Sequence, residues 1–310
     1  MLQPEWWLGA DNFMRPTYRI SPFSTASMTE NRHAQAAKCT ETWFDSRFPG
    51  MRFNWTMRGS EAITLALKNL LLGSDDWVTI LTTTGNHYVS GCVTRSIENV
   101  CKWNRQVNTQ TAAILVIHEF GSFHQDMQKI YSLGVPVIED YAHCFCTSSP
   151  ITSQADYIVF SLPKFIPVQY GGILLSKTEG QNRSAISEGR IQYLEQVVSN
   201  AIPQFPTWCN ARVTNFNWLS HYFSQFGCTT RFKWEQGEIP SVFMFNTPED
   251  IKLPQLKQFM QNAGIESSIF YGEQAFFIPV HHKLNADDLE YFAFVWRTYL
   301  QQQGTLDYAH

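Results

Sequence analysis

The stretch VPVIEDYAH, residues 135–143, decides the fold that the sequence predicts. A helical pattern over residues 125–133 leads through Gly134 into an apolar run that ends at Asp140, which is the order expected of a helix followed by a buried strand. In open α/β sheets, ligands bind at the carboxyl ends of the strands. The stretch therefore predicts one strand of such a sheet, with Asp140 at the end where a site forms.

The same alternation of helix and strand extends outward from this stretch, from about residue 55 to residue 176. A helix is expected over residues 63–72, and Gly73 after it is a natural stop. Further apolar runs predict strands at residues 77–81, 112–118, 157–160 and 172–175. Short β-branched runs separated by helices are typical of a mainly parallel sheet with helices on both faces. The predicted fold class is therefore α/β.

The alternation weakens after about residue 180. Helical patterns and extended patterns then follow one another less regularly, the helical ones at residues 186–198, 215–226, 253–262 and 286–300 and the extended ones at residues 241–245, 264–271 and 275–279. Asn285 is expected to cap the last helix. We therefore expect two domains, a large one over residues 1–200 and a small C-terminal α+β domain over residues 201–310.

The composition of the 310 residues favours a globular protein. Apolar residues make up 44% of the chain and charged residues 16%, which is ample for a buried core and argues against disorder. The 23 basic and 27 acidic residues give a net charge of −4, so no overall field attracts nucleic acid or an anionic membrane. We expect neither of them as a partner.

The lack of a recognisable targeting signal and the pattern of the cysteines favour a cytoplasmic location. Residues 1–7 show no basic region followed by an apolar run, and no stretch reaches the roughly 18 uninterrupted apolar residues of a membrane span. Seven cysteines without framework spacing fit a reducing compartment. The sequence HCFC at residues 143–146 lacks a second paired cluster, so we expect no metal site.

Lys164 stands within an apolar run, FSLPKFIPV at residues 160–168. Burial of an ammonium group is expensive, so such a position favours the neutral amine, which is a nucleophile toward an aldehyde. The alternative is that the side chain extends from a strand end into water. The residues around Lys164 leave both interpretations open.

Asp140 also admits two interpretations. A carboxylate at the carboxyl end of a buried strand is well placed to accept a hydrogen bond from a protonated pyridine nitrogen, which would keep that ring cationic and able to take up electrons. A helix cap or a structural ion pair explains the same carboxylate equally well.

A candidate phosphate site lies where the helical pattern begins, at Gly59-Ser60-Glu61. Free N–H groups at a helix start bind anions, and the Ser60 hydroxyl adds a donor, although ordinary capping explains these residues as well. Ser161 could supply a further phosphate contact. Gly171-Gly172 would let the backbone approach a ligand closely, or would simply form a turn.

The order of these features along the chain is that of a pyridoxal phosphate (PLP) site: a helix-start anion site, an aromatic loop, a strand ending in Glu-Asp, and a lysine segment before two glycines. We therefore predict PLP as the cofactor. Lys164 would be its covalent anchor, and Asp140 would be the partner of its pyridine nitrogen.

These segments resemble the PLP-dependent nucleotide-sugar aminotransferases of the DegT/DnrJ/StrS family, which have the aspartate aminotransferase fold (fold type I). VIEDYAH at residues 137–143 resembles the family's VIEDAAQ signature, and IHEFG at residues 117–121 is similar to its VHLYG strand end. Residues 160–172 resemble its lysine segment, with the lysine-to-glycine spacing kept. The resemblance runs from about residue 58 to residue 176 and returns weakly over residues 264–300, which is about half of the chain.

The resemblance implies roles for individual residues around the cofactor ring. Lys164 would join the cofactor covalently and then carry a proton to and from the substrate. Asp140 would pair with the pyridine nitrogen, and His143 stands where a glutamine usually contacts the ring hydroxyl. Tyr88 matches the aromatic residue that stacks on the ring, with His87 as the alternative.

The resemblance also assigns the phosphate contacts, to Gly59, Ser60, the backbone of Glu61, and Ser161. This chain departs from the family pattern here, because RGSE at residues 58–61 stands in place of Ser-Gly-Thr-Ala and two residues are missing between Ser161 and Lys164. No segment matches the one whose asparagine usually reaches the phosphate of the partner subunit.

The family implies an activity and partners. The chain would transfer an amino group from an amino-acid donor, glutamate by expectation, to a nucleotide-linked keto sugar in polysaccharide or deoxysugar biosynthesis. Because fold-type-I sites are built across a two-fold interface, a homodimer is implied. Two alternatives stay open: a PLP enzyme of another reaction type, and a degenerate relative that binds a sugar nucleotide or a protein partner without turnover.

Overall fold

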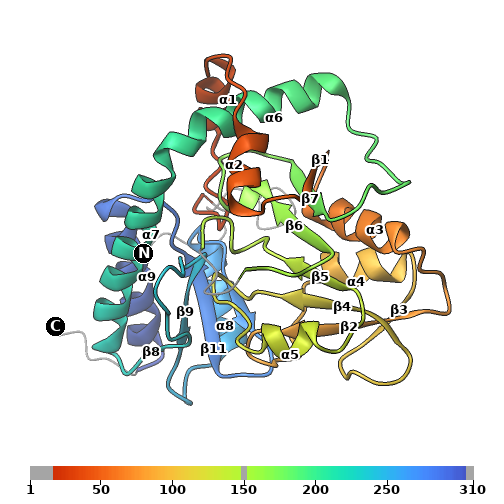
Figure 1. The fold of residues 1–310 in the computed structure, drawn as a ribbon. Helices are drawn as coiled ribbons and strands as arrows, with labels where there is room; N and C mark the ends of the chain where they lie inside the picture. The colour runs from red at the N-terminus through yellow and green to blue at the C-terminus, as the bar shows by residue number, and fades with distance from the viewer. Residues whose placement is uncertain (1–16, 148–151, 305–310) are drawn as a thin grey trace. The chain divides into compact units, whose positions relative to one another are not determined.

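The computed structural model describes residues 17–147 and 152–304, and the chain divides into two compact units (Figure 1). The larger unit holds residues 22–207 and 235–239, and the smaller unit holds the described residues of 1–21, 208–234 and 240–310. The stretch at residues 1–7, considered above for a signal peptide, lies outside the described residues. The division into functional domains at residues 200 and 201 stays a prediction.

The larger unit contains, within the described residues, a seven-stranded sheet in the order β1-β7-β6-β5-β4-β2-β3. β7 pairs antiparallel with both of its neighbours, and the other pairings are parallel. The predicted mainly parallel sheet is therefore confirmed. Its strands are β1 (Arg52–Thr56), β2 (Trp77–Thr82), β3 (Lys102–Asn104), β4 (Thr111–Ile117), β5 (Val137–Asp140), β6 (Tyr157–Ser161) and β7 (Gly172–Ser176).

Helices precede the first of these strands, lie between them and follow the last of them. They are α1 (Thr25–Arg32), α2 (Thr40–Arg47), α3 (Gly59–Asn69), α4 (Gly91–Glu98), α5 (Met127–Tyr131), the short 3₁₀ turn η2 (Leu162–Lys164), α6 (Glu188–Ala201), the 3₁₀ turn η3 (Ile202–Gln204) and the start of α7 (Phe205–Ser224). None of the helices within residues 17–147 and 152–304 is long and apolar enough to cross a membrane.

Helices cover both faces of the larger sheet. Leu67 of α3 and Ile97 of α4 share a buried cluster with Val159 of β6. On the opposite face, Phe44 of α2 packs edge-on against Phe160, the next residue of β6, with ring centroids 5.0 Å apart. Because successive residues of a strand face opposite sides of a sheet, these two contacts bury the sheet from both directions. This confirms the predicted α/β layering.

The end of α3 corrects one prediction. The helix ends at Asn69, before Gly73, and Leu71 adopts the left-handed conformation with φ of 59°. The Leu72 amide donates to the Leu67 carbonyl, and the Leu71 amide donates to the Lys68 carbonyl. These two bonds form a Schellman motif, which usually places glycine at the left-handed position. The expected stop at Gly73 was therefore wrong, because backbone bonding at Leu71 already ends the helix.

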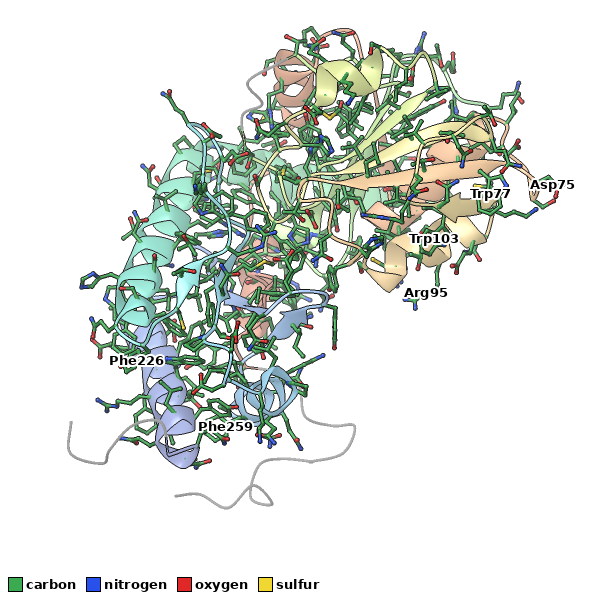
Figure 2. All side chains as sticks on the ribbon, turned by 90° about the horizontal axis from the view of Figure 1, so that it is seen from below. Asp75, Trp77, Arg95, Trp103, Phe226 and Phe259 are labelled. Carbon is green, nitrogen blue, oxygen red and sulfur yellow. The ribbon has the colours of Figure 1, made fainter. Side chains whose placement is uncertain are left out.

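β3 is an edge strand, and its side chains make charged and polar contacts with neighbouring segments. Figure 2 labels three residues of this region, Asp75, Trp77 and Trp103. The Lys102 Nζ lies 3.1 Å from Asp75 Oδ1 and above the ring of Trp77. The Trp103 Nε1 donates to Glu98 Oε1 at 2.9 Å. Charged side chains along an edge strand disfavour pairing with a second sheet.

The smaller unit has, in its described part, an antiparallel sheet in the order β10-β11-β9-β8. The Asn285 side chain accepts a hydrogen bond from the Asp288 amide at 3.0 Å, so the predicted cap of the last helix is confirmed. The expected small α+β region at the C-terminal end is confirmed as well. Its elements are β8 (Thr229–Thr230), β9 (Val242–Asn246), α8 (Leu253–Asn262), β10 (Ser268–Phe270), β11 (Ala275–Pro279) and α9 (Ala286–Gln302), together with most of α7.

Candidate functional site

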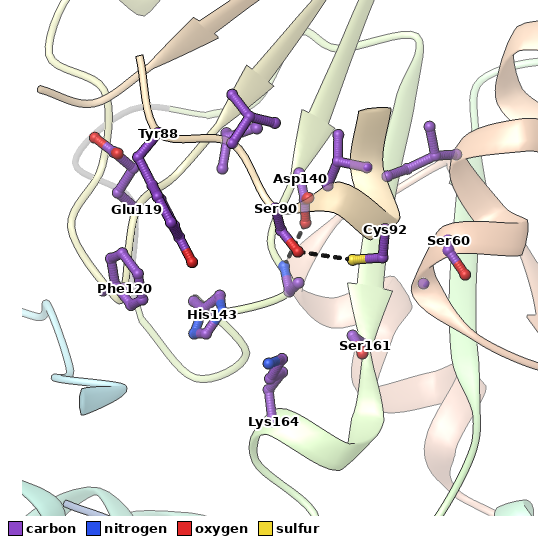
Figure 3. Close-up of a pocket in the computed structure, with 16 residues that line it drawn as sticks. Ser60, Tyr88, Ser90, Cys92, Glu119, Phe120, Asp140, His143, Ser161 and Lys164 are labelled. Atoms are coloured by element: carbon purple, nitrogen blue, oxygen red, sulfur yellow. Dashed lines mark hydrogen bonds between the residues drawn. The ribbon is translucent and has the colours of Figure 1, made fainter. Parts of the chain in front are cut away.

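A pocket of the larger unit lies at the carboxyl ends of three neighbouring strands (Figure 3). Ile117 ends β4, Asp140 ends β5 and Ser161 ends β6, and all three line the pocket. Helices α3 and α4 begin at the same pocket, which holds about 710 Å³ of empty space, open solvent included. This is the position expected for a ligand site in an open α/β sheet.

The structure brings most of the predicted site residues to this pocket. Every one except Glu61 lines it, namely Gly59, Ser60, Tyr88, Asp140, His143, Ser161 and Lys164. The Glu61 carboxylate instead accepts hydrogen bonds from the Met57 amide at 2.6 Å and the Ser184 hydroxyl at 2.8 Å. His87, the alternative to Tyr88, is exposed and lines a different hollow. The roles assigned to these residues stay predictions.

Asp140 is a buried carboxylate that faces the pocket. Its Oδ1 accepts a hydrogen bond from the Ala142 amide at 2.8 Å, and the residue is only 5% exposed. Burial raises the pKa of Asp140 above its ordinary value, although the Ala142 N–H and the charge of Lys164 oppose the rise. A cationic N–H partner in the pocket would stabilise the ionised form. A protonated pyridine nitrogen is such a partner.

Lys164 reaches the pocket from the end of the η2 turn. Its neighbours Leu162 and Phe165 are buried in the core, whereas Lys164 itself is half-buried. Pro163 favours the turn, which the Phe165 amide closes by donating to the Leu162 carbonyl at 3.0 Å. The turn therefore places an amine at the pocket wall while the apolar residues around it remain in the core.

The start of α3 forms one corner of the pocket. Among the described residues no side chain caps the first amides of this helix, and the hydroxyl-bearing residues Ser60 and Ser161 line the same corner. A Cβ on Gly59 would lie 3.0 Å from the Ser161 Cβ, so glycine lets the strand end approach the helix start. This arrangement of amides and hydroxyls suits an anion such as phosphate.

The structure explains why position 172 requires glycine, a question that the sequence left open. A Cβ at this position would lie 2.6 Å from the carbonyl carbon of Arg58 and 2.7 Å from the backbone nitrogen of Gly59. Gly171 has φ of 113°, and a Cβ there would meet Leu162 at 2.7 Å. Both glycines are therefore required by backbone packing against α3 and by a turn.

Glu139 lies behind the pocket in a buried network that the sequence reasoning did not identify. It precedes Asp140 on β5 and so points to the opposite face of the sheet. Its carboxylate accepts hydrogen bonds from His118 Nε2 at 2.8 Å, from the Tyr131 hydroxyl at 2.5 Å and from the Ser153 hydroxyl at 2.5 Å. The network therefore joins the ends of β4 and β5 from behind the pocket.

The bonding pattern sets the charges of this network. The Nδ1 of His118 accepts a hydrogen bond from the His124 amide, so the proton that His118 shares with Glu139 is on Nε2. Burial by itself raises the pKa of Glu139, but the hydrogen bonds from His118, Ser153 and Tyr131 lower it below its ordinary value. The network therefore favours the ionised form of Glu139, whereas burial disfavours the ionised form of its neighbour Asp140.

Two further residues of the pocket, Glu119 and Phe120, come two and three residues after the strand end at Ile117. Phe120 is buried with φ of 53°, and its ring centroid lies 4.9 Å from that of His143. A positive φ is uncommon for a bulky residue and marks a constrained backbone at the pocket. The rule that identified Asp140, a polar residue at the carboxyl end of a buried strand, would also have identified Glu119.

Comparison with known proteins gives a consistent picture of the fold. No protein-family model and no curated protein matches the sequence. Among solved structures, the chain is similar to the aminotransferase TlmJ from Streptoalloteichus hindustanus, with a TM-score of 0.72 at 14% identity over 94% of this chain and 99% of that chain. It is also similar to a DegT DnrJ EryC1 StrS aminotransferase from Brucella abortus, with a TM-score of 0.66 at 13% identity over 89% and 93%.

A third similar structure is that of Spr1654 from Streptococcus pneumoniae, which is assigned as a sugar aminotransferase. Its apo form matches with a TM-score of 0.68 at 14% identity, over 95% of this chain and 98% of that chain. The same protein has been solved in a PMP form and a PLP form. Identities this low show the fold alone. The chain therefore has the type I aminotransferase fold, as its resemblance to the DegT/DnrJ/StrS enzymes predicted.

Proposed function

We propose that this chain is a PLP-dependent aminotransferase whose amino acceptor is a nucleotide-linked keto sugar. The observation that carries the proposal is that Asp140 and Lys164, from separate segments of the chain, line one pocket beside the start of α3. The type I aminotransferase fold supports the same reaction class.

The residues of the pocket fit PLP group by group. Asp140 would hold the ring nitrogen, since a buried carboxylate with a raised pKa gains most from a cationic partner. The first amides of α3, with the hydroxyls of Ser60 and Ser161, would hold the phosphate. Tyr88 and His143 would contact the ring from the walls of the pocket. When bound, PLP supplies an aldehyde that takes up an amino group and a ring that accepts electrons.

The protein's own residues would direct the reaction. The Lys164 Nζ would hold the cofactor before the substrate arrives, and would then move the proton at the substrate's Cα. Asp140 would keep the ring nitrogen protonated. Phe120 and Tyr88 would exclude water from one side of the pocket. One pocket would serve both half-reactions, because the donor and the acceptor exchange the same amino group.

The similar structures support the proposed substrate class. Spr1654, assigned as a sugar aminotransferase, matches over nearly the full length of this chain. We therefore propose an amino acid, glutamate first, as the donor and a sugar nucleotide as the acceptor. A homodimer in the cytoplasm belongs to the same proposal, because sites of this fold type are completed across a two-fold interface.

Reduction with borohydride tests the proposal. Purified protein incubated with PLP should develop a visible absorbance band. Reduction with borohydride should then fix the pyridoxyl group as a covalent label on the peptide that contains Lys164. In a separate, unreduced sample, glutamate should bleach the band and 2-oxoglutarate should restore it. Replacement of Lys164 by alanine should abolish labelling and lower turnover by at least about 100-fold.

Lys177→Ala is the matched control, because Lys177 lies in the same unit but is exposed and paired with Asp156. It should keep both label and turnover. Label on another lysine, or none, would overturn the assignment of Lys164. Binding of a sugar nucleotide by a chain that takes up no PLP would instead favour a relative without turnover.

A further inference from the structure

Residues 83–88, the first part of the loop between β2 and α4, carry Tyr88 to the pocket. Gly85 within it has φ of 72°, and the Gly85 amide donates to the Thr82 carbonyl at 3.1 Å. The Tyr88 amide donates to Asn86 Oδ1 at 2.6 Å. The position of Tyr88 therefore depends on the contacts that fix the polar residues of this loop.

Glu119, at the end of β4, holds the loop at one point. Its Oε2 accepts hydrogen bonds from the Thr84 amide at 2.7 Å and from the Thr84 hydroxyl at 2.8 Å, and the Glu119 residue is only 3% exposed. The Asn86 amide in turn donates to the Thr84 hydroxyl oxygen at 3.2 Å. Figure 3 shows the Glu119 carboxylate pointing away from Lys164, so this side chain serves the loop and not the centre of the pocket.

Arg105, from the segment after β3, holds the loop at a second point. Its Nη2 donates to the Asn86 carbonyl at 2.6 Å and to the Thr82 hydroxyl oxygen at 3.0 Å. Burial lowers the pKa of Arg105, and the charge of Glu119 opposes this effect. The two side chains are therefore close enough for each charge to offset part of the cost of burying the other.

The two contacts converge on Asn86, whose side chain accepts the Tyr88 amide. Arg105 fixes the Asn86 carbonyl, and Glu119 fixes the Asn86 amide through Thr84. Buried hydrogen bonds to charged groups are stronger than neutral ones, so they restrict a short loop more tightly than apolar packing would.

We propose that Glu119 and Arg105 are positioning residues that hold the 83–88 loop and thereby set Tyr88 against the cofactor ring. The loop-holding part stands on the geometry of the chain alone. The part that concerns the ring rests on the proposed function, because it requires PLP in the pocket.

Hydrogen exchange of the chain without cofactor tests the loop-holding part. Glu119→Gln keeps the size of the side chain but removes its charge, and should speed exchange of the amides in residues 83–88 by about tenfold or more. Asp156→Asn is the matched control, since Asp156 Oδ2 also accepts a backbone amide, that of Val137. It should leave exchange in the loop unchanged.

Exchange in the loop that is equal in Glu119→Gln and the wild type would overturn the proposal. Thr84→Val removes the hydroxyl's bond to Glu119 and its bond from the Asn86 amide, but keeps the bond from the Thr84 amide to Glu119, and should change exchange in the same direction. This variant decides the question if Glu119→Gln fails to fold.

A double-mutant cycle tests the part that concerns the ring. Glu119→Gln should raise the PLP dissociation constant by about tenfold when Tyr88 is present, and by less than about twofold in a Tyr88→Ala background. The visible circular dichroism of bound PLP should change in the first comparison only. Equal losses in both backgrounds would show that Glu119 does not act through Tyr88.

A wild-type chain that binds no PLP would refute the proposed function. The exchange experiment would still decide whether Glu119 holds the loop.

Discussion

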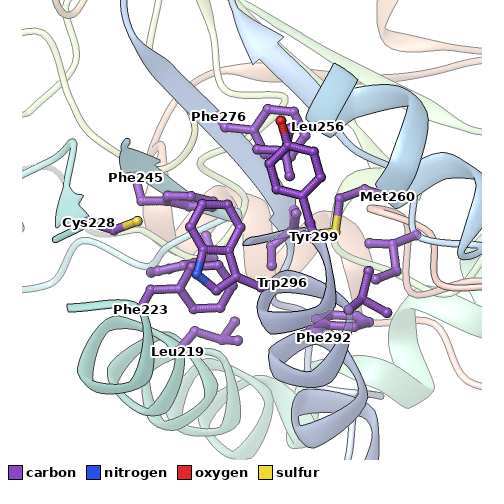
Figure 4. Packing of buried hydrophobic residues seen from close by; sticks show 14 of the residues in the cluster. Leu219, Phe223, Cys228, Phe245, Leu256, Met260, Phe276, Phe292, Trp296 and Tyr299 are labelled. Atoms are coloured by element: carbon purple, nitrogen blue, oxygen red, sulfur yellow. The ribbon is translucent and has the colours of Figure 1, made fainter. Parts of the chain in front are cut away.

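The aromatic core of the smaller unit and the strand ends of the larger unit are built in opposite ways. In the core, Phe223, Phe245 and Trp296 are fully buried with ring centroids 4.8 to 5.7 Å apart (Figure 4). At the strand ends, His118, Glu119, Glu139 and Asp140 are equally inaccessible. Apolar burial stabilises without further conditions, whereas each buried charge needs its own partners. The strand ends therefore depend on specific hydrogen-bond partners, which the aromatic core does not need.

Removal of a core ring should produce the largest loss of stability. Phe245 is fully buried among four other aromatic rings. Phe245→Ala should lower the free energy of unfolding by about 3–5 kcal/mol, because it removes the buried ring and leaves a cavity. Urea denaturation followed by far-UV circular dichroism measures the change.

Phe294 provides the control for this prediction, because it lies on α9 of the same unit but is 55% exposed. Phe294→Ala should change the free energy of unfolding by less than about 0.5 kcal/mol. Similar losses for the two variants would mean that the rings around Phe245 do not form a packed core.

Removal of one buried charge should cost less, and for a different reason. Glu139→Gln keeps the volume of the side chain but leaves three donors, from His118, Tyr131 and Ser153, facing an amide that can accept from only one of its two ends. The free energy of unfolding should fall by about 2–3 kcal/mol. Glu179→Gln, at an exposed ion pair, should change it by less than about 0.5 kcal/mol. Urea midpoints that coincide for the two variants would refute the role of the network.

The stabilisation by Glu139 should also depend on pH. Its folded pKa lies below the ordinary value of 4.5, so its contribution is present above that pH and is lost as the pH falls through the folded pKa. The difference in unfolding free energy between the wild type and Glu139→Gln should therefore be full at pH 7 and shrink below about pH 4.5. Denaturation series at several pH values measure it, and a difference independent of pH would contradict the prediction.

The larger unit also shows which features a sequence can predict. The fold and the placement of Asp140 follow from local patterns, because apolar runs mark buried strands and strand ends mark sites in such sheets. The short elements α4, β1 and β3 were not predicted, because their patterns are brief and their place in the sheet is set by tertiary pairing. Leu71 in the left-handed conformation is likewise set by backbone bonding that its identity does not reveal.

The network around Glu139 is a feature that could not be predicted from the sequence. Its donors come from three segments, at residues 118, 131 and 153, and no spacing relates them. The alternating direction of side chains along a strand predicts only that Glu139 and Asp140 face opposite sides of the sheet. Which side becomes a hydrogen-bonded interior and which becomes a pocket depends on the folded chain.

The smallest predicted effect concerns Asp140 and has the opposite sign. The folded pKa of Asp140 is raised, so its contribution to stability is present below the unfolded pKa and is lost as the pH rises through the folded value. Ionised Asp140 therefore destabilises the cofactor-free chain at neutral pH. Asp140→Asn removes the charge but keeps an oxygen that can accept the Ala142 amide, and should raise the free energy of unfolding by about 1 kcal/mol at pH 7.

The same substitution should weaken PLP binding, because a neutral amide does not stabilise a protonated ring nitrogen as a carboxylate does. Adjacent residues of β5 would then respond in opposite directions to the loss of a charge: Glu139→Gln would destabilise the chain, and Asp140→Asn would stabilise it at the expense of the cofactor. Urea denaturation without PLP and a PLP titration of each variant measure the two effects. A loss of stability in Asp140→Asn as large as that in Glu139→Gln would contradict the prediction. It would show that the Asp140 carboxylate stabilises the folded chain itself, as Glu139 does, and does not depend on a ligand for a partner.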